Sequence, residues 1–171
     1  MLSDALVKVA GMHRKPEQEY RPRPSSSGPE RCLRQLVYKA MGFIEALKSD
    51  RFEVLLNDSS WQEYSTASLI ELSSFELHSQ QLVLNCGTTT HLGKPYDVVG
   101  SIDGIVRDLL GVDRLWEHKA INHFGFERYL KGDAYPEDYL TQCCLYLVGL
   151  QKQNLEIREA VMLIKNKNTS A

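Results

Sequence analysis

The stretch VVGSIDGIVRDLLGVDRLWEHKA, residues 98–120, constrains the fold more than any other part of the chain. Alternating and β-branched residues flank Leu110–Gly111, and this pattern predicts two antiparallel strands joined by a turn. If the hairpin is symmetric about Leu110, Asp103 and Glu117 are equally distant from that point along the chain. The two carboxylates then become cross-strand neighbours, with Cβ atoms about 5 Å apart.

The predicted hairpin brings two acids and an ammonium group together. Lys119 shares a face of its strand with Glu117, whereas the His118 side chain points to the opposite face. Neighbouring carboxylates repel each other, and a hard cation removes that cost. Oxygen ligands with open coordination positions suit Mg²⁺ or Mn²⁺, which also bind substrate phosphates. The stretch therefore predicts a metal site for phosphodiester chemistry, the alternative being a surface hairpin with an ordinary charge pair.

Length and composition favour a single domain with one core. A chain of 171 residues that is 43% hydrophobic can bury a core of that kind. A net charge of -2 provides no general basic surface, so binding to a polyanion would require a local cluster or a metal. The sequence contains neither a membrane-spanning apolar run nor a secretory pattern, so we expect a cytoplasmic protein without a membrane partner.

The segments before the hairpin predict a flexible arm, two helices and a strand. The arm covers residues 1–28, with a short helix at 1–9; its basic residues either contact a nucleic-acid backbone or stay solvated. Helical periodicity predicts a helix over 29–48, whose buried stripe includes Leu33, Ile44 and Leu47. The remaining predictions are a helix over 60–73 capped by Asp58 or Ser59, a strand over 76–86 and a loop over 87–97.

The segments after the hairpin predict a turn at 131–133, a helix over 136–151 and a final strand over 158–166. The whole order indicates an α/β arrangement with a mixed sheet. Gln142 and Tyr146 project together from the predicted helix, where they either orient a water, a phosphate or the lysine, or form a satisfied core pair. Gly100 and Gly104 bracket Asp103, and they either admit a ligand or relieve crowding.

Three segments in this order resemble the PD-(D/E)XK nuclease superfamily, in the RecB-like branch that includes phage exonucleases: G-S-I-D-G at 100–104, E-H-K at 117–119 and Q-C-C-L-Y at 142–146. C-L-R-Q-L-V-Y-K-A-M-G, at 32–42, is similar to an opening helix of such phage domains. The resemblance also covers Y-P-E-D-Y-L-T-Q and I-K-N-K-N-T-S near the C-terminus. It implies a restriction-endonuclease-like core, with a central mixed β-sheet flanked by helices, over residues 29–171.

The resemblance also implies a function and a site. It assigns catalytic roles to Asp103, Glu117, Lys119, Gln142 and Tyr146. Asp103, Glu117 and the backbone carbonyl of His118 would bind Mg²⁺ or Mn²⁺, and Lys119 would position or deprotonate the attacking water. The expected activity is metal-dependent hydrolysis of DNA by an exonuclease, in recombination, repair or phage DNA processing. The expected setting is the cytoplasm of a bacterium or of a phage-infected cell.

The sequence departs from the family pattern at several points. Many RecB-like members have a histidine ligand on the helix before the first strand, where this chain offers Gln62 or Glu63. Cys32 has no later cysteine set beyond Cys144, so no iron-sulfur cluster is expected. The chain ends directly after the last predicted strand, as expected of a minimal or truncated form. These departures leave two alternatives: an inactive, nuclease-derived DNA-binding or interaction module, and a structural protein without a nucleic-acid role.

Overall fold

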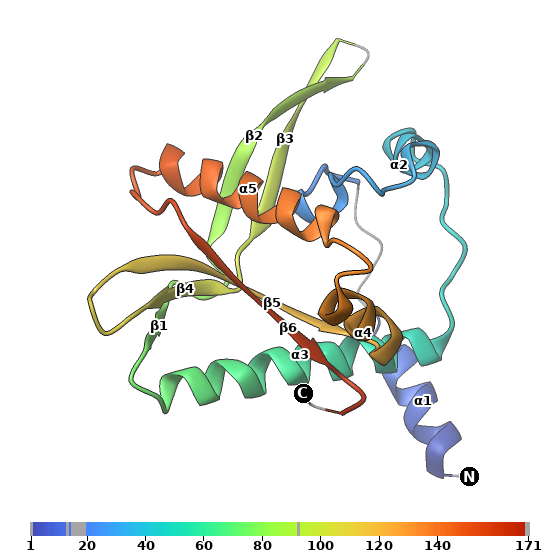
Figure 1. The fold of residues 1–171 in the computed structure, drawn as a ribbon. Helices are drawn as coiled ribbons and strands as arrows, with labels where there is room; N and C mark the ends of the chain where they lie inside the picture. The colour runs from blue at the N-terminus through green and yellow to red at the C-terminus, as the bar shows by residue number, and fades with distance from the viewer. Residues whose placement is uncertain (1, 13, 15–19, 92, 170–171) are drawn as a thin grey trace.

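A mixed four-stranded sheet and a separate antiparallel hairpin form the framework of the structure (Figure 1). The computed structural model describes residues 2–12, 14, 20–91 and 93–169, apart from the side chain of His91. The sheet has the order β1-β4-β5-β6, in which β6 runs parallel to β5 and the other neighbours are antiparallel. Its strands are β1 (Glu76–His78), β4 (Gly104–Arg107), β5 (Asp113–Ile121) and β6 (Ala160–Asn166). The hairpin consists of β2 (Val83–His91) and β3 (Lys94–Ser101).

Two long helices, α3 (Asp50–Glu71) and α5 (Glu137–Lys152), cover opposite sides of the sheet (Figure 1). Alternation along β5 explains this arrangement, because Glu117 contacts α5 whereas His118 contacts α3. Shorter helical segments are α1 (Leu2–Met12), η1 (Pro24–Ser26), α2 (Leu33–Ala40) and α4 (His123–Lys131). Within the described ranges, no helix has the length and apolar character required to cross a membrane.

The hydrophobic core lies between α5, the hairpin base and the sheet. Leu84 of β2, Leu115 of β5 and Leu150 of α5 are fully buried there, together with Ile102. Gly149 lets α5 approach β2 closely, because a Cβ atom at this position would lie 3.0 Å from the Leu84 Cβ. This packing fixes α5, and with it the polar residues that α5 directs toward β5.

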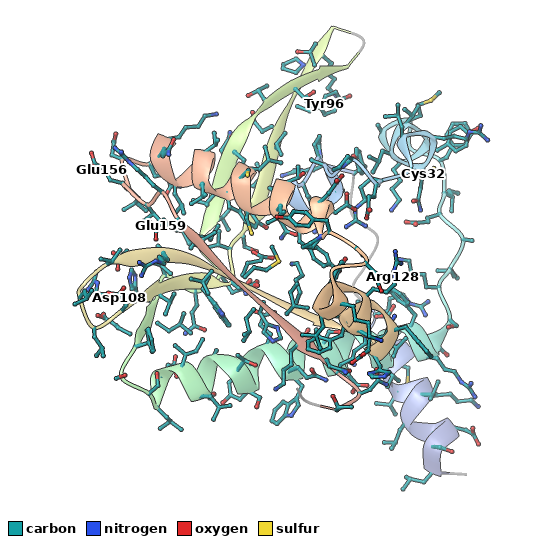
Figure 2. The ribbon with its side chains drawn as sticks, viewed as in Figure 1. Cys32, Tyr96, Asp108, Arg128, Glu156 and Glu159 are labelled. Atoms are coloured by element: carbon teal, nitrogen blue, oxygen red, sulfur yellow. The ribbon has the colours of Figure 1, made fainter. Side chains whose placement is uncertain are left out.

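The β4–β5 hairpin has the register predicted from the sequence. Gly104 pairs with Trp116 and Arg107 pairs with Asp113, so the connection is centred on Leu110. Gly111 adopts φ +77°, a conformation that glycine tolerates without a Cβ clash. Outside the turn, Arg114 forms ion pairs with Asp108 at 2.5 Å and Glu159 at 2.7 Å. Figure 2 shows that these two acids lie on the same side of the molecule.

Two helices upstream of the sheet differ from the prediction. The helix expected over 29–48 is confined to α2, and Gly42 beyond it has φ +75°. Three residues of the expected buried stripe are exposed instead, since Leu33, Ile44 and Leu47 retain 74%, 88% and 84% of their accessible surface. Periodicity marks one apolar side of a helix but does not supply a surface to cover it. The second helix begins at Asp50 rather than at residue 60, because Ser49 is extended at the N-cap and acidic residues occupy the first turn.

The strand expected over 76–86 and the loop expected over 87–97 are also corrected by the structure. Ser79 and Gln81 have positive φ angles of 52° and 56°, so the chain breaks between β1 and β2. The expected loop is largely β-structure, because its threonine run pairs with residues of β3. In contrast, the turn at 131–133, the helix α5 and the strand β6 confirm the predictions downstream of the hairpin.

The last residues of the expected flexible arm contact the folded body. Val99 donates a backbone hydrogen bond to the Pro22 carbonyl at 3.2 Å. Pro24, the first residue of η1, is buried, and η1 packs against α5 and β3. Further upstream, Arg14 binds Asp50 and Glu53 of α3. The predicted division of the chain at residue 28 stays a prediction, but the structure places residues 20–28 against the domain.

Candidate functional site

One cavity of about 780 Å³ opens beside the end of β4. Its walls come from β2, β3, β5, α3, α5, η1 and the segment that precedes η1. All the site residues predicted from the sequence line this cavity: Asp103, Glu117, His118, Lys119, Gln142 and Tyr146. The structure thus brings together residues that are up to 43 positions apart in the chain.

The hairpin register positions Asp103 at the mouth of the cavity. Asp103 directly precedes β4, and its Oδ2 accepts a hydrogen bond from the His118 backbone N–H at 2.7 Å. The carboxylate thus accepts the hydrogen bond that a backbone carbonyl would accept if β4 extended to this position. Because the N–H and C=O of one strand residue point to the same side, the His118 carbonyl also opens on this edge.

Glu117 is fully buried from solvent at the floor of the cavity. Its Oε1 accepts a hydrogen bond from Gln142 Nε2 at 2.7 Å and forms an ion pair with Lys119. Its Oε2 is buried with no hydrogen-bond partner among the described residues. A buried oxygen left in this state carries an unrelieved desolvation cost, so it is a candidate ligand atom.

Gln142 and Tyr146 form a polar pair on the inner face of α5. Besides binding Glu117, the Gln142 amide contacts the Tyr146 hydroxyl at 3.4 Å. Both of these side chains are buried. The sequence analysis left open whether they orient the site or satisfy each other in the core. The hydrogen bond to Glu117 shows that Gln142 orients the carboxylate itself.

Lys119 has two neighbours that fix its ammonium group. Besides the ion pair with Glu117, its Nζ lies 5.3 Å from the ring centroid of Tyr139. A cation near an aromatic ring gains about 0.5 to 2 kcal/mol. The sequence analysis missed Tyr139, although its position three residues before Gln142 places it on the same side of the helix.

Glu63 of α3 adds a third acid to the cavity wall. The sequence analysis placed either Gln62 or Glu63 near this point. Gln62 instead donates a hydrogen bond to the Lys167 carbonyl at 3.3 Å. Glu63 accepts one from Gln81 at 3.1 Å while it lines the cavity. Helix α3 thus contributes a carboxylate in the region where many RecB-like proteins carry the histidine that this sequence lacks.

Burial shifts the protonation equilibria of the acids in the same direction. Desolvation raises the pKa of Glu117 to about 7 although the nearby Lys119 ammonium opposes the shift. Desolvation also raises the pKa of Asp103, against the His118 N–H and Lys119. The pKa of Glu63 is raised by burial and then by the charge of Asp103. The site therefore holds more negative charge than its surroundings stabilise.

The side chain of His118 does not face these acids. The ring is buried on the α3 side, where Nε2 lies 3.3 Å from the Thr66 hydroxyl. Burial, followed by the charges of Lys165 and Lys119, lowers the pKa of His118 to about 4. The ring is therefore neutral at pH 7, and only the backbone of this residue faces Asp103.

The two glycines beside Asp103 permit close packing. A Cβ at Gly100 would lie 2.9 Å from Pro24 Cδ and 3.0 Å from the Tyr146 hydroxyl. A Cβ at Gly104 would lie 2.9 Å from a methyl group of Leu77. Of the two alternatives left open by the sequence, relief of crowding accounts for both positions.

The donor set fits a hard divalent cation that keeps part of its water shell. Over the described ranges, no three His, Cys, Asp or Glu side chains lie together closely enough to form a metal cluster. Mg²⁺ is commonly held by one or two carboxylates, with water and substrate phosphates as the other ligands. Asp103, the orphaned oxygen of Glu117 and the His118 carbonyl match that pattern.

The chain was compared with models of protein families, with curated proteins and with solved structures. None of the three comparisons finds a match.

Proposed function

We propose that this protein is a divalent-metal-dependent deoxyribonuclease with a restriction-endonuclease-like core, and that it acts as an exonuclease. The observation that carries the proposal is the buried Glu117, which lines one cavity with Asp103. One of its oxygens pairs with Lys119, and the other has no hydrogen-bond partner among the described residues. Two carboxylates and an ammonium at a solvent-open cavity are suited to phosphodiester hydrolysis. The motif resemblance gives the same assignment independently of the geometry.

Each residue of the site has its own role in the proposed hydrolysis. Asp103, Glu117 and the His118 carbonyl would hold Mg²⁺ or Mn²⁺. When bound, the ion would polarise the phosphoryl group and lower the pKa of the attacking water. Lys119 orients that water and offsets the negative charge that develops on the phosphoryl oxygens. A bond forms between water oxygen and phosphorus, the bond to the 3′ oxygen breaks, and a proton ends on the leaving oxygen.

Gln142 supports this chemistry without touching the substrate phosphate. Its amide holds Glu117 Oε1 at 2.7 Å, which leaves Oε2 as the oxygen available to a cation. The same amide nitrogen also donates to the Tyr146 hydroxyl at 3.4 Å, which limits the rotation of the amide. Both are positioning residues, so their loss should weaken activity less than the loss of Lys119.

A second candidate is a DNA-binding module without turnover. The observation that favours it is the pairing of Glu117 Oε1 with both Lys119 and Gln142, which leaves the carboxylate only one open oxygen. This candidate predicts DNA binding without cleavage under Mg²⁺ or Mn²⁺.

A cleavage assay separates the two candidates. Purified protein with end-labelled linear DNA and Mn²⁺ should release nucleotides, and EDTA should stop the release. Lys119→Ala should lower the rate by at least about a hundredfold, as expected for a residue that stabilises charge in the transition state. Lys131→Ala is the matched control, because this exposed lysine pairs only with Glu127 on its own helix among the described residues.

Full activity in Lys119→Ala would remove the assignment. An inactive wild-type protein that still binds DNA would favour the second candidate.

A further inference from the structure

A second cavity, of about 520 Å³, adjoins the site cavity. The two cavities share Glu63, His118 and Lys119 in their walls, so they meet beside the lysine of the proposed site. The other walls of the second cavity are Arg14, Ala120 and the N-terminal half of α3, against which α1 packs (Figure 1). A molecule bound at the site therefore has space to extend along α3.

The wall that α3 contributes is uncharged and partly apolar between Glu53 and Glu63. Leu56, Asn57 and Ser60 lie there on one side of the helix, because they are three or four positions apart. Leu56 is 47% exposed, so it offers apolar surface to a ligand. The side-chain amide of Asn57 has no hydrogen-bond partner among the described residues, which leaves its donor and its acceptor available.

The cations of this cavity are already paired. Arg14 binds Glu53 at 3.1 Å and Asp50 at 2.9 Å. Lys119, the other cation that the described residues place in the wall, pairs with Glu117. A phosphate would therefore gain little charge compensation here. A base with its sugar is uncharged and needs none.

The size of the cavity fits a single nucleoside. Sites for small organic ligands measure about 300 to 1,000 Å³, and a nucleotide is a ligand of this kind. A base that is paired and stacked in a duplex must first leave its stack to enter such a cavity, which costs free energy. An unpaired end enters without that cost.

We infer that this cavity holds the unpaired terminal nucleoside of a DNA strand while the phosphate attached to that nucleoside lies at Asp103 and Glu117. The inference rests on the proposed function and deepens it. It assigns the substrate, a single-stranded or frayed end, and the product, a deoxynucleoside 5′-monophosphate. Leu56 supplies apolar contact, and the Asn57 amide pairs with the hydrogen-bonding edge of the base.

The first test is the binding of thymidine 5′-monophosphate, measured by isothermal titration calorimetry in Mg²⁺ with inorganic phosphate as the reference. Neither ligand contains a phosphodiester, so binding is measured apart from cleavage. The nucleotide should bind at least about tenfold more tightly than phosphate, because its base and sugar bury apolar surface against Leu56. Asn57→Trp fills the cavity and should remove this difference while phosphate affinity stays the same.

Leu69→Trp is the matched control. It places the same indole ring on α3, at a position that is 62% exposed and does not line the cavity, so nucleotide affinity should not change. Asn57 is exposed as well, and the melting temperatures of both variants should match that of the wild type. If Asn57→Trp does not fold, Ser60→Trp blocks the same wall one turn later.

The second test compares a labelled single strand with a blunt, GC-rich duplex of the same sequence. Fluorescence anisotropy gives both dissociation constants at one salt concentration, with Ca²⁺ in place of Mg²⁺. The single strand should bind at least about tenfold more tightly, because no base pair has to open. Asn57→Trp should reduce this preference, and Leu69→Trp should keep it.

Equal affinity of the wild type for thymidine 5′-monophosphate and phosphate would overturn the inference. Undiminished nucleotide affinity in Asn57→Trp, an equal loss in Leu69→Trp, or a duplex bound as tightly as the single strand would overturn it as well. DNA cleavage combined with any of these results would leave the nuclease proposal standing. Nucleotide binding that Asn57→Trp abolishes, in a protein that cleaves no DNA, would refute the nuclease proposal and leave the nucleoside site standing.

Discussion

Replacing Glu117 by glutamine should stabilise the metal-free protein at alkaline pH. The side chain is fully buried, and burial raises its pKa from the ordinary value of 4.5 to about 7. At about 1.4 kcal/mol per pH unit, this shift means that the ionised carboxylate costs about 3 kcal/mol in the folded state. Glutamine keeps the shape and removes the charge.

The direction in which the unfolding free energy changes with pH follows from proton binding in the folded and unfolded states. Below pH 4.5 Glu117 is protonated in both the folded and the unfolded chain, so it adds no pH-dependent term. Between pH 4.5 and about 7 only the folded chain keeps the proton, so the unfolding free energy falls as pH rises. Above pH 7 Glu117 is ionised in both states, so the full cost of burying its charge lowers the unfolding free energy. His118, whose pKa is lowered to about 4, has the opposite effect, but it does so in both proteins and largely cancels in their difference.

Urea unfolding in EDTA measures the effect at several pH values from 4.5 to 8. The stability of Glu117→Gln minus that of the wild type should increase by about 3 kcal/mol over this range. Adding Mn²⁺ at pH 8 should narrow the gap, because the ion stabilises only the protein that binds it. A difference that stays constant with pH would refute the reasoning.

Three further substitutions test the packing around the site. Gly100→Ala forces a methyl group against Pro24 and should cost about 1 to 3 kcal/mol of unfolding free energy, measured by urea denaturation. Leu84→Ala opens a void in the fully buried core and should cost about 2 to 5 kcal/mol in the same assay; a cost below about 1 kcal/mol would contradict the core assignment. Thr66→Val removes the hydroxyl beside the buried ring of His118 and should lower stability by about 1 to 3 kcal/mol at pH 7, whereas an unchanged melting curve would show that the contact contributes nothing.

The parts of the fold predicted best from the sequence depend on local rules. The β4–β5 register follows from a turn with one glycine at positive φ and from strand alternation on both sides. That register alone places Asp103 beside the backbone of His118. Helix α5 was predictable because a long apolar side continues over four turns. These elements carry most of the candidate site.

The parts that the sequence did not reveal depend on contacts distant in the chain. The apolar residues of 29–48 have helical spacing, but the spacing cannot show that the described fold leaves Leu33 and Ile44 exposed. The threonine run of β2 shows no hydrophobic alternation, so its sequence predicts a loop, whereas pairing with β3 makes it a strand. Glu63 enters the site only because α3 packs across β5. The sequence also does not show that the side chains of residues 21–24 alternate in exposure, because this alternation depends on packing against β3.

The most direct test of the account is a crystal structure of the protein soaked in Mn²⁺, with the metal located by its anomalous scattering. The account predicts one strong peak between Asp103 and Oε2 of Glu117, within reach of the His118 carbonyl. The peak should be absent from crystals of Asp103→Asn. A cavity without a peak at saturating Mn²⁺, or a peak that persists in the variant, would contradict the assignment of these acids as a metal site.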